Sequence, residues 1–182
     1  MPTDRSWRGP AAHVAVTLVW VVTNLLAWWI EPSGTVLAIA VAVHLLAVVI
    51  SLGPIVLLDW YGLVWIAGLR RLRAVTAVTQ TAHPLIWTGL LLLLVSGAFL
   101  DPDYAAPMTW VKQVMVLVLL HNGLALRPLE RLLRAQPHDT TLETIPTALR
   151  RRMMGATMTS QIAWWTAFGI GVLVMLTRRT LV

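Results

Sequence analysis

Cysteine is missing from this chain, and charged residues are scarce, at 12% of its 182 residues. Without cysteine there can be no disulfide, no thiolate metal site, no covalently attached c-type haem and no cysteine-ligated iron–sulfur cluster. Hydrophobic residues make up 58% of the chain, well above the roughly one half found in soluble domains. The composition predicts an integral membrane protein, because the apolar runs are too many and too long for a signal peptide followed by a soluble body.

Motifs for hydrolysis and phosphate binding are also absent. No Ser–His–acid set or carboxylate pair falls within the apolar runs, and the long polar stretch 127–159 has no glycine-rich phosphate loop. The net charge of +6 comes largely from arginines between apolar runs. This placement favours membrane topology and anionic lipid, and not nucleic acid, as the reason for the charge.

Five apolar runs predict five transmembrane helices, at about residues 11–30, 35–66, 74–100, 108–126 and 160–176. We expect a single all-α transmembrane domain with a four-helix bundle core and a peripheral fifth helix. The third helix is extended back to residue 74 because a start at Pro84 would leave it shorter than the roughly 20 residues a span needs. Residues 127–159 are expected to form a cytoplasmic basic loop.

Positive charge is distributed unevenly between the two ends of these helices. If the N-terminus is inside, only three of the 14 basic residues lie outside, namely Lys112, Arg178 and Arg179. Positive residues are enriched on the cytoplasmic side of membrane proteins. The bias therefore predicts a cytoplasmic N-terminus and an external C-terminus.

Four histidines lie in four of the five expected helices. At a rise of about 1.5 Å per residue, His44 and His121 fall in the outer-to-middle part of the bilayer, and His13 and His83 in its inner half. Ionisable side chains at such depth are costly and normally face the bundle interior. The histidines therefore sort into an outer and an inner pair, each drawn from two helices.

The neighbours of two histidines support inward-facing positions. His44 shares its helical face with small residues, which admit either a flat ligand or another backbone; they are Ala40, Ala47 and Ser51. His13 begins a polar stripe in an apolar helix, which continues with Thr17, Trp20 and Asn24.

Paired imidazoles on facing helices can have three roles in a membrane protein. They can ligate the iron of haem b, they can bind copper, with Met115 as a further ligand, or they can hydrogen-bond between helices. Of the three roles, haem ligation best explains why the histidines occur in pairs. We expect one or two haems, with His44 and His121 as the ligands of an outer haem and His13 and His83 as those of an inner one. Lys112 could pair with the propionates of an outer haem, and Arg70, Arg71 and Arg73 with those of an inner one.

The order of several motifs resembles the membrane domain of the copper-resistance CopD family. The similar stretches are "VHLLAVVISLGPIVLLDW", "TGLLLLLVSGAFL" and "WVKQVMVLVLLHNGLALRPLERL", and they cover about residues 36–134. The matching features are His44, the Thr88-Gly89 and Ser96-Gly97 steps, Lys112, and Asn122 with Pro128. The resemblance implies a helical bundle of the bacterial plasma membrane with a role in copper uptake or another metal-linked or haem-linked role. It also implies that His44 is the position of greatest functional weight.

The first hypothesis for function is a membrane b-type cytochrome that transfers electrons through bis-histidine haem, as an electron carrier or redox subunit and not a stand-alone enzyme. The alternatives are copper handling of the CopD type and a non-catalytic accessory subunit of a larger membrane complex. The expected partners are the lipid bilayer, a quinol or redox proteins, and further copies or subunits, with no nucleic acid.

Overall fold

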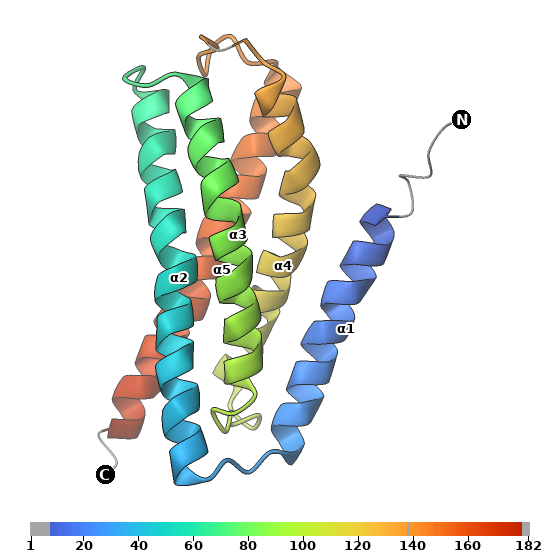
Figure 1. Cartoon of the computed structure of the whole chain (residues 1–182), viewed down its shortest axis with the longest axis vertical. Helices are drawn as coiled ribbons and strands as arrows, with labels where there is room; N and C mark the ends of the chain where they lie inside the picture. The colour runs from blue at the N-terminus through green and yellow to red at the C-terminus, as the bar shows by residue number, and fades with distance from the viewer. Residues whose placement is uncertain (1–7, 138, 180–182) are drawn as a thin grey trace.

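The computed structural model describes residues 8–137 and 139–179, which form five α-helices. In chain order they are α1 (Arg8–Trp29), α2 (Gly34–Ile66), α3 (Leu72–Gly97), α4 (Pro107–Arg134) and α5 (Thr147–Arg179). Successive helices run in opposite directions along one long axis, and α1 stands at the side of the others (Figure 1). All five are long and apolar enough to cross a bilayer. The prediction of an all-α membrane protein with five transmembrane helices is confirmed.

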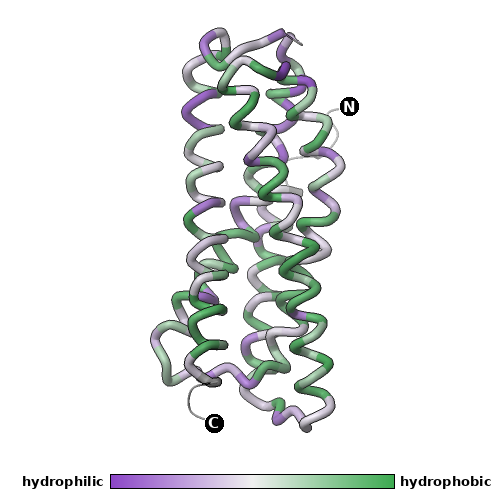
Figure 2. The backbone as a smooth tube through the Cα atoms, turned by 90° about the vertical axis from the view of Figure 1, so that its left-hand side faces the viewer, coloured by the Kyte–Doolittle hydropathy of each residue, from purple (hydrophilic) through white to green (hydrophobic). Residues whose placement is uncertain are grey.

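The surface of the bundle is apolar along much of its length. Large hydrophobic side chains are exposed on every helix, among them Trp29 at 84% and Val49 at 68%. Hydrophobic residues run along the middle of the helices, whereas hydrophilic residues gather mainly at one end (Figure 2). A soluble protein would bury such contiguous apolar area, and here it is the surface that faces lipid.

The main hydrophobic core joins α2, α3, α4 and α5. Its buried members are Ile55, Leu90, Leu94, Leu119, Leu120, Ala163 and Trp164. A second cluster closes the end that carries the α2–α3 and α4–α5 turns, with Trp65, Leu72, Leu129, Ile145 and Leu149 buried in it. The four-helix core is thus built from the last four helices of the chain.

The expectation that the fifth helix is peripheral is wrong, because α1 takes that place. Ala163 on α5 is only 1% exposed and Trp164 only 5%, since small residues on that face let α5 lie close to its neighbours. On α1, Ala27 is buried, whereas Val14 and Leu18 are more than half exposed.

Two helices are longer than the sequence predicted. Helix α4 continues through Pro128 to Arg134, and α5 begins at Thr147, so only residues 135–146 connect them where 127–159 were expected to form a loop. The extra turns are held by packing, because Leu129 and Leu149 are both buried in the second cluster. Other bounds agree closely, and His83 and Pro84 lie inside α3 as predicted.

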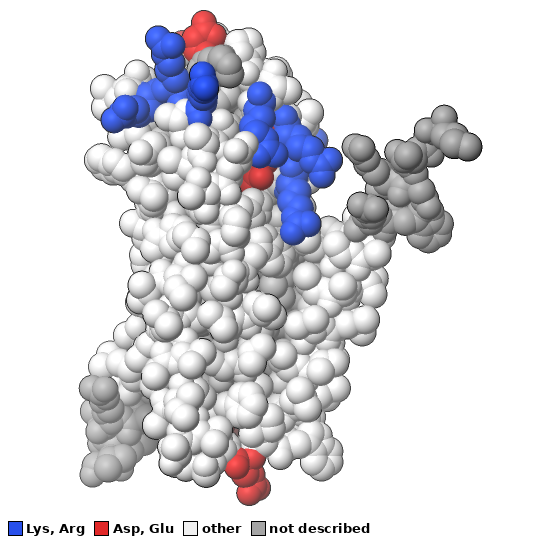
Figure 3. All heavy atoms as spheres, viewed as in Figure 1, with Lys and Arg blue, Asp and Glu red and all other residues white. Residues whose placement is uncertain are grey.

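Charge separates the two ends of the bundle. On the face shown in Figure 3, lysine and arginine gather at the end with the α2–α3 and α4–α5 turns, with some acidic side chains among them, whereas the opposite end shows acidic side chains alone. We call the first of these the cationic end. It is defined by Arg70, Arg71, Arg73, Arg127, Arg131, Arg134, Arg150, Arg151 and Arg152.

Candidate functional site

The polar stripe of α1 faces α4 along most of its length. Trp20 Nε1 donates to the backbone carbonyl of Gln113 at 2.9 Å. At the end of the stripe that lies away from the cationic end, the Tyr104 hydroxyl donates to Asn24 Oδ1 at 3.1 Å. The apolar side of α1 is therefore left to lipid, and its polar side is paired with the bundle.

The central contact of this seam joins His13 of α1 to His121 of α4. Their Nδ1 atoms lie 2.7 Å apart, while the ring centroids are 5.0 Å apart and the ring planes differ by only 6°. Because the nitrogen atoms are much closer than the centroids, the parallel rings meet edge to edge and are not stacked face to face. The contact is a direct hydrogen bond between two imidazoles.

Thr17 fixes which histidine donates. Its hydroxyl donates to the carbonyl of His13 at 2.9 Å, so the single hydroxyl proton is used and the oxygen can only accept from His121 Nε2, 3.0 Å away. A neutral His121 protonated at Nε2 must accept at Nδ1, and His13 must then donate from its own Nδ1. With Thr17 donating to this carbonyl, the neutral pair has the proton of His121 on Nε2 and that of His13 on Nδ1, which leaves His13 Nε2 with a lone pair.

His44 lies in the seam between α2 and α3. Its Nδ1 is 2.9 Å from Ser96 Oγ, and the Ser96 hydroxyl donates to the carbonyl of Leu92, so His44 must donate from Nδ1 and keep its lone pair on Nε2. The small residues on this face meet another backbone. A Cβ placed on Gly89 would lie 2.5 Å from Ser51 Cβ and 2.9 Å from the carbonyl oxygen of Ala47. The backbone of α3 therefore lies against the face of small residues on α2.

His83 pairs with an acid near the cationic end. Its Nδ1 lies 2.8 Å from Glu130 Oε1, and the two side chains are 21% and 15% exposed. Beside this pair the Arg127 guanidinium lies 5.5 Å from the ring centre of Trp87. Gly123 admits Trp87 against α4, because a Cβ there would be 3.0 Å from the indole. The cluster joins α3 to α4.

One polar contact within the bundle was not singled out as a site. Asp59 of α2 accepts from Gln161 Nε2 of α5 at 2.7 Å, and Gln161 accepts in turn from Trp165 Nε1. The sequence signal was present, since Asp59 is an acid seven residues from the end of α2. Its partner on α5 comes from tertiary packing, and the contact joins two helices.

The predicted histidine pairs are wrong as pairs. His121 meets His13 and not His44, and His83 meets Glu130 and not His13. Among the predicted cations, Lys112 lies near enough to His44 for its charge to act on the imidazole. Arg70, Arg71 and Arg73 line a cavity at the cationic end that none of the four histidines lines.

These arrangements do not fit bis-histidine haem. No iron atom fits between two nitrogen atoms 2.7 Å apart, and both ring nitrogens of His121 are hydrogen-bonded. Over residues 8–137 and 139–179, no group of three or more His, Asp or Glu side chains could hold a metal ion. His44 retains the arrangement common in metal-binding histidines, with one nitrogen bonded to a protein partner and the other carrying a lone pair. Haem and copper both stay predictions.

Comparison of the chain with protein-family models, with curated proteins and with solved structures finds no match.

Proposed function

We propose that the protein transfers protons within the membrane along the seam between α1 and α4, and that the His13–His121 pair is its central element. The observation that carries the proposal is the 2.7 Å contact between the two Nδ1 atoms. Ionisable residues are rare within membrane spans, and chains of histidine and acidic side chains there mark proton relays in pumps and transporters.

The tautomers define how a proton would move. A proton taken up by the lone pair of His13 Nε2 makes that ring an imidazolium. The proton on its Nδ1 can then pass to His121 Nδ1 along the existing hydrogen bond, which leaves His13 neutral and His121 charged. His121 is relieved of charge when its Nε2 proton leaves on the side of Thr17. One proton enters at His13 and one leaves at His121, after which His13 holds its proton on Nε2 and His121 on Nδ1, and both rings must return to the first tautomers before a second proton passes.

The alternative use of the pair, a structural hydrogen bond, does not account for the choice of two titratable groups. A hydrogen bond between helices contributes on average about 0.6 kcal/mol in a membrane, and Ser, Thr or Asn side chains provide it without the cost of an ionisable group. The polar stripe also extends beyond the pair, with Trp20 bonded to Gln113 of α4 and Asn24 bonded to Tyr104. It therefore offers polar groups at successive depths.

Orientation is part of this proposal. We place the cationic end in the cytoplasm and the chain in a bacterial plasma membrane, because positive residues flank membrane spans mainly on the cytoplasmic side. His13, the sixth residue of α1, would then take up or release protons on the cytoplasmic half of the bilayer.

Proton flux into vesicles tests the proposal. Purified protein is reconstituted into liposomes that contain a pH-sensitive dye, and a potassium diffusion potential drives proton entry. We expect faster acidification than in protein-free liposomes, and we expect His121→Asn to reduce the rate at least about tenfold. The matched control is His44→Asn, which changes a histidine in the α2–α3 seam and should leave the flux intact. Flux equal to that of empty liposomes, or an equal loss in both variants, would overturn the proposal.

A second candidate is a haem b protein, the first hypothesis from sequence, and His44 is the observation that favours it. With Nδ1 held by Ser96, its Nε2 could serve as a single axial ligand, and Lys112 would pair with a propionate. Haem would supply one-electron transfer. A reduced-minus-oxidised spectrum of the purified protein tests this, with His44→Ala expected to abolish the signal and Ser96→Ala to weaken it. A colourless wild-type protein would exclude it.

A further inference from the structure

The turn between α2 and α3 is a rigid feature at the cationic end. Gly68 takes a left-handed conformation with φ of 72°, its N–H bonds to the carbonyl of Trp65, and the N–H of Leu69 bonds to that of Val64. This pair of bonds is a Schellman motif, which ends a helix and fixes the direction of the following residues. Leu69 is 74% exposed at its tip.

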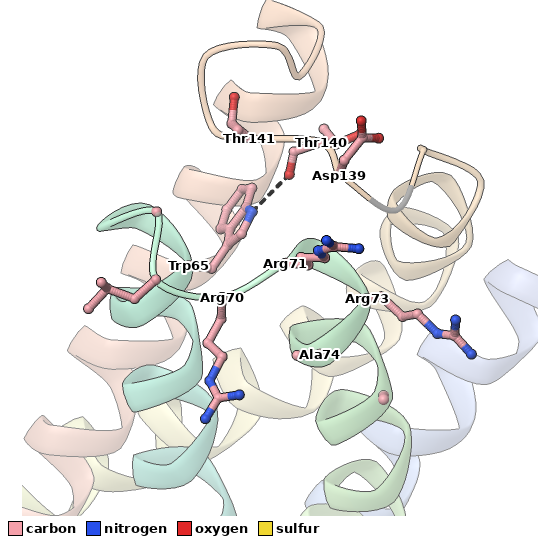
Figure 4. Close-up of a pocket in the computed structure, with 11 residues that line it drawn as sticks. Trp65, Arg70, Arg71, Arg73, Ala74, Asp139, Thr140 and Thr141 are labelled. Carbon is pink, nitrogen blue, oxygen red and sulfur yellow. Dashed lines mark hydrogen bonds between the residues drawn. The ribbon is translucent and has the colours of Figure 1, made fainter.

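An open cavity of about 720 Å³ lies on one side of this turn. Trp65 forms part of its wall, and the indole N–H donates to the carbonyl of Thr140 at 3.0 Å, which ties the turn to the α4–α5 loop (Figure 4). The charged side chains in its lining are Arg70, Arg71, Arg73 and Asp139. Three arginines and one aspartate give the lining a net positive charge, which favours an anion, although the three guanidinium groups point in different directions (Figure 4).

A second, smaller cavity of about 350 Å³ shares Leu69 and Arg70 with the first. Its other walls are apolar or aromatic, formed by Trp60, Tyr61 and Val64. Trp60 is 62% exposed, and tryptophan and tyrosine are the residues enriched where a membrane meets water. Arg70 therefore lies between a cationic cavity and an apolar one at the level of the lipid headgroups.

We propose that this turn binds one anionic phospholipid, with the phosphate in the arginine-lined cavity and the upper part of an acyl chain along Leu69, Trp60 and Val64. Guanidinium groups match the geometry of phosphate oxygens and bind them in pairs. A free phosphate would use the first cavity and leave the second empty, whereas a phospholipid fills both. The apolar cavity that shares Arg70 is therefore the reason to choose a lipid.

The site differs from a general attraction of basic residues to a charged membrane, and this difference is testable. Arg151 and Arg152 are exposed in the first turns of α5 and line neither cavity. If the arginines only provide surface charge, they are equivalent to Arg70 and Arg71. If the turn is a binding site, only the loss of Arg70 and Arg71 should weaken lipid binding.

Native mass spectrometry of the detergent-solubilised protein measures the retained lipid. The wild-type protein is titrated with phosphatidylglycerol, with phosphatidylcholine, and with phosphatidylglycerol in the presence of inorganic phosphate. We expect one tightly held phosphatidylglycerol that phosphatidylcholine does not replace. Arg70→Gln/Arg71→Gln should weaken its binding by about thirtyfold, because each charge near the headgroups contributes about fivefold.

The control is Arg151→Gln/Arg152→Gln, which removes the same charge and should bind as the wild type does. Leu69→Ser keeps all charges and should also weaken binding, because it removes the apolar wall common to both cavities. Equal losses in the two arginine pairs would overturn the proposal in favour of surface charge. Displacement of the lipid by inorganic phosphate would overturn it in favour of a small-anion site.

Discussion

His13 and His121 form one planar unit across the α1–α4 interface, with Nδ1 atoms 2.7 Å apart and ring planes that differ by 6°. The hydroxyl of Thr17, already donating to a carbonyl, decides the tautomers of both rings. A threonine one turn from His13 thus controls where the proton of the pair lies.

This control predicts specific tautomers. In nitrogen NMR of isotope-labelled histidine, at a pH where both rings are neutral, His121 should carry its proton on Nε2 and His13 on Nδ1. Thr17→Val removes the acceptor of His121 and should mix the two tautomers. The control Thr23→Val removes a hydroxyl that bonds only to carbonyls of its own helix and should change neither. An His121 signal with the proton on Nδ1 in the wild type would contradict the assignment.

The α2–α3 seam predicts a sharp difference between two glycines. A Cβ at Gly89 would lie 2.5 Å from Ser51 Cβ, whereas one at Gly97 would meet its nearest atom, His44 Cε1, at 3.7 Å. Gly89→Ala must push the helices apart and should cost about 1–3 kcal/mol of unfolding free energy. Gly97→Ala makes an ordinary contact and should cost little. Thermal unfolding in detergent compares the two, and equal melting temperatures would argue against the close approach.

Replacement of the two adjacent tryptophans of α5 by alanine should destabilise the protein to different extents. Trp164 is 5% exposed within the main cluster, and Trp165 is 50% exposed. Trp164→Ala leaves a cavity between four helices and should lower the unfolding free energy by about 3 kcal/mol, at the lower end for a buried aromatic side chain. Trp165→Ala should cost less than half as much. If Trp165→Ala lowered the unfolding free energy more than Trp164→Ala did, the face of α5 that packs against the bundle would be assigned wrongly.

Burial raises the pKa of the Tyr104 hydroxyl above its ordinary value of 10.0. The folded state therefore holds the phenol proton more tightly than the unfolded state does. The contribution of Tyr104 to stability is constant below pH 10 and is lost as the pH rises through its raised pKa. The chain has only two tyrosines, so Tyr61→Phe leaves Tyr104 as the single phenol. Its ionisation, followed by tyrosinate absorbance, should have a midpoint above 10. A midpoint at or below 10 would contradict burial beside Asn24.

The sequence was sufficient for the number and type of helices, because lengths and apolar content are local properties. It also placed His83 inside α3 and His44 on a face of small residues. Helix ends in the polar stretch were missed, since the turns that extend α4 and α5 are held by Leu129 and Leu149 in a cluster of distant residues.

The pairing of histidines could not be obtained by counting residues along each helix. His83 lies 14 residues before Gly97, the last residue of α3, and His121 lies 14 residues after Pro107, the first residue of α4, and both of these ends lie away from the cationic end. Equal counts would put them at one level, yet His83 meets Glu130, nine residues further along α4 than His121. The offset arises because neighbouring helices extend to different distances at their ends, which only tertiary packing decides.

Helix α1 is attached to the other helices by hydrogen bonds from its polar stripe, at His13, Trp20 and Asn24, and by Val16 and Trp20 packed against the main cluster. Such bonds are worth most where water is excluded, because no solvent competes for the donors. Its attachment therefore depends on the solvent around it more than that of the tightly packed helices does. A detergent that admits water should release α1 while the remaining bundle stays folded, so a choice of mild, lipid-like detergent decides whether the histidine pair survives purification.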